Sequence, residues 1–497
     1  MAFLLSLSPV VLIFVLVVFF RMSVFRLALV SFFYTAAMAF LFFATPLRVL
    51  ALASLDGLLT TLPLLLVVYA GILISVFLLD KGSLQRLTST LTRGVDGDFK
   101  RALLLAGGLG NFFEGAGVIA EPVVAPMLYS VGISPTGSAV LSILGYAGLM
   151  HLALAGVIVT VLANVTALPP QELALTLALL SFPAVFSLFL AIPFFIGQPG
   201  GLMRQVPLIF LFSLVVSASA YGVVRFVGFS VAAMMGGLAG VLFLFLVFKT
   251  RIHLTRESFK DMVPFLFLLV SLASINLLPP VRHLFAWKLA FQVRVIPFHP
   301  ITFRPLANAY LYLFVAFFVS YGLFSEKEDK IMDYLAVAWG KGVKPLVSMA
   351  LFGAMGSVIA FSGLKGDLSG VVLPRNMAHC LAQGLVASTG PLYPLFAPVL
   401  GWMGTFLTGY GVASILLFGK LQVATAQMLG VSKTLLASSL TVGASVGSIS
   451  SPFKIAIAAP LCNAVGREGE ILRWSIPIGI FVSLLVGLLC LWMKGGL

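Results

Sequence analysis

The sequence predicts an all-α polytopic membrane protein with about 12 transmembrane helices and two re-entrant hairpins in two inverted repeats. Of its 497 residues, 61% are hydrophobic and 9% are charged, whereas a soluble domain carries roughly 25% charged residues. Several apolar runs approach the ~20 residues that a spanning helix needs. A glycine-rich motif also occurs twice, in distant halves of the chain.

The duplicated motif reads G-x-F-(F/L)-x-G-x-G and begins at Gly110 and at Gly404, 294 residues apart. A second shared string, G-(I/V)-S-x-T-x-x-A, begins at Gly132 and at Gly430, 298 residues apart. The two offsets differ by about one helical turn. Internal duplication in a very apolar chain is typical of secondary transporters, whose substrate sites lie where two repeats meet.

Apolar runs define the expected spans along the chain. These are 2–20, 27–44, 58–79, 138–166, 172–196, 205–227, 229–249, 262–279, 306–323, 345–362, 434–463 and 474–494. The first run has no basic stretch before it and no cleavage site of small residues after it, so we expect a retained span. The longest polar stretch, 80–101, is expected to be a loop or in part a surface helix, and no soluble domain is predicted.

Two further apolar stretches, 102–131 and 394–430, are interrupted by glycine and proline. Each is long enough for two half-depth helices with a tip between them, so we expect two re-entrant hairpins. Such backbone is tolerated at membrane depth only where protein or a water-filled cavity surrounds it. The first hairpin belongs to a predicted repeat over 1–249, and the second to a predicted repeat over 250–497.

Basic loops predict the orientation, because lysine and arginine favour the cytoplasmic side. Three connections are expected inside, and they carry Lys81, Arg86, Arg93, Lys100 and Arg101, then Lys249, Arg251, Arg256 and Lys260, then Lys327, Lys330, Lys341 and Lys344. Arg21, Arg26, Arg204, Arg467 and Arg473 then also lie inside. The loop 280–305 conflicts with this orientation, because it is basic yet falls on the outer side of the membrane. An odd number of spans separates the hairpins, so they enter from opposite faces.

Two acidic residues of the first hairpin are the candidates for proton coupling. Glu114 lies inside the duplicated motif, and Glu121 precedes Pro122. An ionisable group in the hydrocarbon layer is costly and marks a functional site by default. The alternative is a carboxylate that caps free backbone N–H groups at the hairpin tip.

The hairpin tips are also the candidates for substrate binding. Glycine allows positive φ and close backbone approach, and free N–H groups at helix N-termini bind anions such as a carboxylate. The alternative is that small residues let helices pack closely. The candidate residues at the two tips are Gly115, Gly117, Gly409 and Gly411, with Asn111 and Thr405 at equivalent repeat positions.

Two lysines in the second half extend the candidate site. Lys454 follows a predicted helix break that includes Ser450 and Pro452. A lysine there can face a cavity and pair with a carboxylate, either of the substrate or of Glu114, whereas the alternative is snorkelling to the interface. Lys420 is a second candidate, and Gln422 could bind a polar solute or another helix.

Several functional classes have no support in the sequence. It contains no Walker A motif, no HExxH, no metal cluster and no GxSxG, so we expect neither an ATP-driven pump nor an enzyme, and no metal or cofactor. The net charge of +14 sits mostly in short loops, which favours the positive-inside rule over a nucleic-acid partner. The expected partners are the lipid bilayer, a small carboxylate anion, a proton and, as one option, a second copy in a homodimer.

These motifs resemble the L-lactate permease family of carboxylate transporters. The resemblance lies in Phe113–Ala116 with Pro122, in Ala397–Gly409, in Leu417–Gln422 and in later strings that run to Arg473. It implies proton-coupled uptake of small 2-hydroxymonocarboxylates, chiefly lactate and glycolate, at the cell membrane. It also implies an elevator motion that carries substrate between two hairpins.

The chain departs from this family at several site positions. The family continues Ser-Asp-Thr-Ser-Ser-Asn after the glycine at 409, where this chain runs from Tyr410 to Ile415 without an acid or an amide. Lys420 replaces an asparagine, Lys454 replaces a serine, and Glu121 lies where the family has a Gly-Thr-Pro run. The departures leave uniport or exchange as alternatives to symport, and another anion, inorganic or dicarboxylate, as an alternative substrate. A membrane enzyme or a non-transporting assembly subunit is the alternative from another class.

Overall fold

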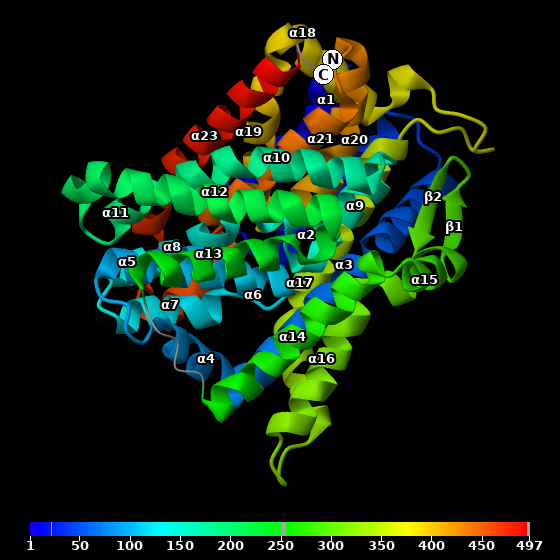
Figure 1. Ribbon diagram of the computed structural model, residues 1–497. Helices are drawn as coiled ribbons and strands as arrows, with labels where there is room; N and C mark the ends of the chain where they lie inside the picture. Colours follow the sequence, from blue (N-terminus) through cyan, green and yellow to red (C-terminus); the bar gives the residue numbers. More distant parts are fainter. Residues whose placement is uncertain (21, 250–254, 495–497) are drawn as a thin grey trace.

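The computed structural model describes residues 1–20, 22–249 and 255–494, and its regular structure is almost entirely helical (Figure 1). Among these residues, nine helices are long and apolar enough to cross a membrane, or ten if one bent pair counts as a single span. The predicted class of polytopic helical membrane protein is therefore confirmed. The described strands are β1 (Phe291–Ile296) and β2 (His299–Phe303), an antiparallel hairpin inside the stretch 280–305 that we expected to be a plain loop.

The prediction of about 12 spans was too high, because some apolar runs form short or broken helices. Runs 2–20 and 306–323 form α1 (Ala2–Val18) and α16 (Ala309–Phe324), which are shorter than a full span. Run 138–166 is split into α8 (Pro135–Ala147) and α9 (Val157–Thr166) by two 3₁₀ turns. Conversely, α20 (Gly411–Leu429), expected as a hairpin arm, is long enough to span a membrane.

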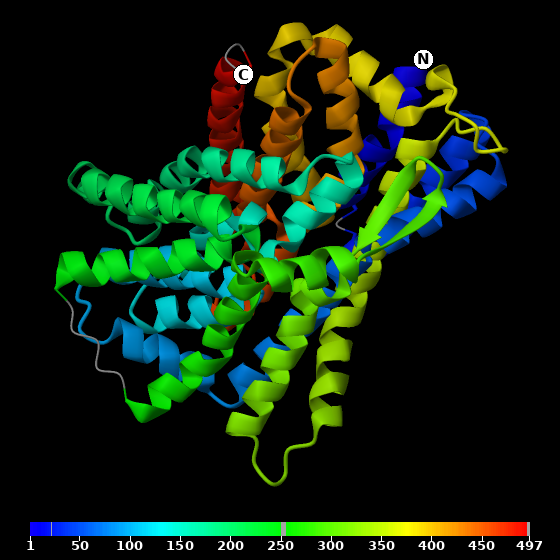
Figure 2. The ribbon, with the colours of Figure 1, turned by 45° about the vertical axis from the view of Figure 1, so that its right-hand side comes forward.

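One group of helices is built around α3 and α17. It comprises α2 (Val24–Leu41), α3 (Leu47–Asp80), α14 (Arg256–Leu277), α16 and α17 (Ile331–Phe361). Gly57 of α3 and Gly353 of α17 lie so close that a Cβ on either would clash with the other helix. Figure 2 shows α16 and α17 running together to the turn that joins them.

A second group holds the hairpins and the helices around them. In Figure 1, α10 (Pro170–Phe189), α12 (Leu202–Phe226) and α13 (Ala232–Phe248) lie roughly parallel. Beside them pack α19 (Tyr393–Thr408), α20, α21 (Lys433–Val446) and α23 (Glu468–Met493). The smaller helices are α4 (Ser83–Thr92), α11 (Ile192–Phe195), α15 (Pro279–Arg282) and α18 (Met377–Thr389).

Both predicted hairpins form helix–turn–helix structures. The first runs through α5 (Asp98–Ala102), a π-helical stretch (Leu103–Gly110) and α6 (Asn111–Ala116), reverses at Gly117 and returns in α7 (Glu121–Ser130). The second runs through α19, reverses at Gly409 and returns in α20. The helix after each hairpin is then broken: α8 gives way to α9, and α21 gives way to α22 (Pro452–Ala458).

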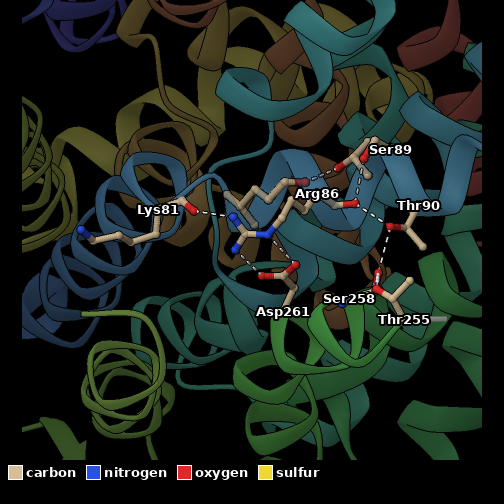
Figure 3. A network of polar contacts seen from close by, with 9 residues as sticks. Lys81, Arg86, Ser89, Thr90, Thr255, Ser258 and Asp261 are labelled. Atoms are coloured by element: carbon tan, nitrogen blue, oxygen red, sulfur yellow. Dashed lines mark hydrogen bonds and ion pairs between the residues drawn. The ribbon is translucent and has the colours of Figure 1, made fainter. Parts of the chain in front are cut away.

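Two of the three basic connections meet where Arg86 faces Asp261 (Figure 3), and Lys81 contacts the third through Asp329. Lys81 forms an ion pair of 2.7 Å with Asp329. Arg86 donates to both carboxylate oxygens of Asp261, at 2.8 and 3.1 Å. These contacts join the loop after α3 to the start of α14 and to the α16–α17 turn, which agrees with the predicted common side. Arg21 and Arg251, which belonged to that prediction, lie outside the described residues.

Candidate functional site

A buried ionic cluster joins the first hairpin to the break after the second. The Lys454 ammonium donates to Glu121 Oε1 at 3.3 Å and lies 3.6 Å from Glu114 Oε1. It also donates to the Tyr146 hydroxyl at 2.6 Å, which in turn donates to Glu121 Oε1 at 2.5 Å. Each of the four residues is at most 7% exposed. The predicted pairing of Lys454 with Glu114 is therefore present in the structure.

The broken helix places Lys454 next to the tip of the second hairpin. Pro452 begins α22, and the Ser451 hydroxyl accepts the backbone N–H of Lys454 at 3.3 Å as its N-cap. The same hydroxyl donates to the Gly409 carbonyl at 2.9 Å. Because Lys454 also contacts Glu114, the two hairpin tips are linked through this short segment.

The two glutamates hold the other side of the cluster. Glu114 Oε2 accepts the Ala120 N–H at 3.2 Å, so this carboxylate caps the first tip as well as facing Lys454. The capping alternative and the pairing prediction therefore hold together. Glu121 begins α7, and its Oε2 atom is buried with no partner among the described residues.

The charge of this cluster is unbalanced when every group is ionised. Two carboxylates then face one ammonium, which leaves one uncompensated negative charge in a buried site. An unpaired buried charge is strongly destabilising, and two carboxylates at close range favour one bound proton. The arrangement can therefore hold a proton, an anion, or both.

Asn111 and Thr405 make equivalent hydrogen bonds in the two hairpins. The Asn111 amide donates to the carbonyls of Gly107 and Gly145, at 2.7 and 2.8 Å. The Thr405 hydroxyl bonds to the carbonyls of Gly401 and Ala444, at 3.3 and 2.7 Å. Each side chain thus ties the first arm of its hairpin to the following helix.

The four tip glycines divide into two kinds. Gly117 and Gly409 have φ values of +88° and +84°, in the left-handed region that favours glycine. Their N–H groups donate to the carbonyls of Glu114 and Thr405. Gly115 and Gly411 are packing positions, since a Cβ would meet the backbone of α13 at the first and that of α21 at the second.

The remaining predicted residues have partners of their own. The Lys420 ammonium lies over the Phe361 ring, 3.6 Å from its centroid. Gln422 exchanges hydrogen bonds with the Tyr393 hydroxyl, at 2.9 and 3.1 Å. The Ser450 hydroxyl donates to the Ser475 carbonyl at 2.9 Å. The Gln422 contact joins two helices, which is the alternative that we gave for this residue.

A second buried polar group was not expected from the sequence. His299 Nδ1 lies 2.9 Å from Asp56 Oδ1, and His299 Nε2 lies 2.9 Å from the Asn164 carbonyl. Ser357 donates to the other Asp56 oxygen at 3.1 Å. The lone acid in the apolar run of α3 was the available signal for this site. Tyr146 was also missed, because a tyrosine in an apolar helix has no distinctive pattern.

Metal ligation has no visible basis in the part of the chain that the structure describes. Within it, no group of three or more His, Cys, Asp or Glu side chains could hold an ion. The cysteines Cys380, Cys462 and Cys490 are free and buried.

Comparisons with known proteins identify relatives of this chain. A family model described as L-lactate permease matches residues 2–494. The chain is 32% identical to the glycolate permease GlcA of Escherichia coli (strain K12) over 189 residues, which are 38% of this chain and 31% of that protein. It is 24% identical to the L-lactate permease of the same strain over 477 residues, 86% of this chain and 84% of that protein. It is 28% identical to the L-lactate permease of Streptococcus iniae over 372 residues, 70% and 73% of the two chains.

Solved structures also include a chain that is similar at low sequence identity. The YdaH transporter of Alcanivorax borkumensis shares 15% sequence identity and a TM-score of 0.44, over 90% of this chain and 86% of that chain.

Proposed function

The chain belongs to the L-lactate permease family, and from this premise we propose that it is a secondary transporter of small organic monocarboxylates such as lactate and glycolate. The single observation that carries the proposal is Lys454, a buried cation shared between two buried carboxylates. The multi-pass fold suits a carrier in the cell membrane, and the buried cluster lies where two hairpins are linked.

Lys454 is the proposed ligand of the substrate carboxylate. Charge-assisted hydrogen bonds are roughly twice as strong as neutral ones, and burial strengthens them further. In the described conformation Glu114 and Glu121 fill this role. A substrate anion must therefore displace at least one of them from the ammonium.

The charge balance of that exchange supports coupling to protons. Without substrate, one ionised glutamate and one protonated glutamate beside Lys454 give a neutral site. A bound monocarboxylate adds one negative charge, and protonation of the second glutamate restores neutrality. The cluster therefore favours one proton per monocarboxylate, and Glu114 and Glu121 are the proposed carriers.

The same balance disfavours the rival substrates. A dicarboxylate or a divalent inorganic anion would need a second cation within the cluster. The other candidate lysine, Lys420 of the second hairpin, lies over the Phe361 ring and not in the cluster. A uniporter or exchanger would arise if the glutamates kept a fixed protonation state. In that case a proton gradient would not drive uptake.

The transport cycle is proposed to be alternating access of elevator type between inverted repeats over 1–249 and 250–497. Its support is the recurrence of a hairpin followed by a broken helix in both halves. Each hairpin tip also rests on a helix of the other group. A Cβ on Gly71 of α3 would clash with Gly117, and a Cβ on Gly409 would lie 3.3 Å from Val24 of α2.

Counterflow in proteoliposomes tests this proposal. Vesicles loaded with unlabelled L-lactate should accumulate labelled L-lactate or glycolate, and an inward proton gradient should increase net uptake. Succinate and phosphate should compete weakly. Accumulation of succinate in preference to lactate, or uptake indifferent to the proton gradient, would overturn the substrate and the coupling respectively.

A further inference from the structure

A pocket of about 860 Å³ lies against the second hairpin tip. One of its lining residues, Phe453, directly precedes Lys454 in the chain. One wall comes from the start of α2 and the segment before it, and another from α17. The tip and the break provide the remaining wall, through Tyr410 and Phe453. The ammonium of Lys454 faces the carboxylates of the first hairpin instead.

The charge of this pocket has one sign. Arg26 of α2 and Lys344 of α17 both line it, and both are exposed. No acidic side chain is among the described residues of the lining. Concave sites lined by one sign of charge raise the local concentration of the opposite ion. From the sequence we expect both cations on the cytoplasmic side, and the structure brings them to one pocket.

Two aromatic residues, Tyr410 and Phe453, line the pocket, and Phe453 directly precedes Lys454 in the chain. The Tyr410 and Phe453 rings lie 4.7 Å apart between centroids, at an interplanar angle of 50°. The tip packs tightly at this point, because a Cβ on Gly409 would lie 3.0 Å from the Cβ of Phe453. Tyr410 is only 7% exposed.

Resting on the proposed function, we propose that this pocket is the cytoplasmic entrance through which a monocarboxylate reaches Lys454. Arg26 and Lys344 gather the anion, and the Tyr410–Phe453 pair closes the inner end. Closure keeps water from the cluster, which strengthens the electrostatic interactions there. The pair must separate for the substrate to reach the ammonium.

The first test measures the pocket without requiring transport. Ser23 lines the pocket, is exposed, and makes no capping hydrogen bond, so Ser23→Cys introduces an exposed thiol there. The native cysteines are buried and should react slowly. An anionic thiol reagent should react faster than a cationic reagent of the same size, by on the order of three- to tenfold at low salt. The preference should disappear in Arg26→Gln/Lys344→Gln and persist in the control Lys330→Gln/Lys341→Gln, whose exposed lysines lie outside the pocket.

The second test measures the gate. Ser451 is fully buried and precedes Phe453 by two residues, so Ser451→Cys should react slowly with the anionic reagent. Removing the ring in Ser451→Cys/Phe453→Ala should raise that rate on the order of tenfold, since opening no longer requires the pair to separate. An unchanged rate would overturn the gate.

The third test connects the pocket to transport. At equal pH on both sides, Arg26→Gln/Lys344→Gln should raise the half-saturating lactate concentration on the cytoplasmic side by roughly fivefold, with the maximal exchange rate unchanged. The control pair should match the wild type. An unchanged half-saturating concentration would overturn the entrance.

The outcomes separate this proposal from the proposed function. If the labelling rate of Ser23→Cys does not depend on the charge of the reagent, the pocket is not an anion entrance, even if lactate is transported. Charge-sensitive labelling without any lactate flux instead overturns the monocarboxylate assignment. A charge preference that is present in vesicles of phosphatidylcholine alone, but is lost when phosphatidylglycerol is included, would make the pocket a lipid-headgroup site and overturn the entrance.

Discussion

The two helical hairpins are built alike but carry different chemistry. Each reverses at a glycine with positive φ, at Gly117 and Gly409, and each is tied to the following helix by Asn111 or Thr405. Only the first hairpin brings carboxylates to its tip, and the cation that faces them comes from the helix break after the second. The duplicated residues thus maintain the framework, whereas the residues that differ between the halves supply the charges.

The two lysines of the second half sharpen this contrast. Lys454 contacts two carboxylates, and its removal would leave them without a counter-ion. Lys420 lies over an aromatic ring, where a cation contributes far less. Of the two lysines, Lys454 is the one that joins the hairpins.

The largest expected effect follows from removing the cation. Lys454→Gln should raise the half-saturating lactate concentration strongly, by a free energy on the order of 2–5 kcal/mol, and by more than Lys454→Arg does. Purified variants should be compared in lactate-binding titrations and in exchange at equal pH. A Lys454→Gln protein that binds lactate normally would remove this lysine from the site.

Folding provides a control for that variant. Leaving two buried carboxylates without a cation costs ~3–5 kcal/mol of stability. The double variant Lys454→Gln/Glu121→Gln should recover much of the thermal stability without recovering lactate binding. Recovery of both together would indicate that Lys454 acts only through folding.

The next effect distinguishes proton coupling from site building. Glu114→Gln keeps the shape of the side chain and removes its charge, so uptake driven by a pH gradient should fall while lactate–lactate exchange persists. Glu121→Gln should behave similarly, because both carboxyls face Lys454. Equal loss of driven uptake and exchange would point to a structural role for the residue concerned.

A smaller effect, similar in the two hairpins, is expected at Asn111 and Thr405, which tie each hairpin to the following helix. Asn111→Ala and Thr405→Val each leave a buried carbonyl without a donor, which costs ~1–3 kcal/mol of stability. Both should lower thermal stability while the half-saturating lactate concentration stays within about twofold of the wild type. A variant that loses substrate affinity at normal stability would place that residue in the binding site.

The smallest effect is expected at Lys420. Lys420→Gln should change lactate transport little, because a contact with an aromatic ring contributes about 0.5–2 kcal/mol. Initial rates of exchange over a range of lactate concentrations measure this directly. A rise in the half-saturating concentration as large as that of Lys454→Gln would refute the contrast between the two lysines.

The charged centre was predictable from the sequence because ions in apolar segments require partners. Glu114 and Lys454 stand in such segments, and the helix break before Lys454 made Glu114 one of its two expected partners, beside the substrate carboxylate. The hairpins were predictable because glycine and proline interrupt otherwise continuous apolar runs. Tyr146 was not predictable, since its role depends on the distance between α8 and α22, which no local pattern encodes.

The misjudged elements have local physical reasons. The run 138–166 contains no proline, aspartate, glutamate, lysine or arginine, and the residues at the break, Leu154 and Ala155, are apolar although they adopt positive φ, so hydrophobicity does not indicate the break. The β-hairpin is short, and its alternation over Phe291–Ile296 is hard to distinguish within a loop where apolar and basic residues are mixed throughout. His299 then meets Asp56 across 243 residues, a contact that only the tertiary fold reveals.

Proton uptake upon lactate binding tests the central claim most directly. Titration calorimetry of the purified protein, in buffers with different ionisation enthalpies, gives the number of protons taken up per lactate bound. Since two carboxyls share one lysine, we predict about one proton per lactate in the wild type, and a smaller number in Glu114→Gln. Lactate binding to the wild type without any proton uptake would contradict the account.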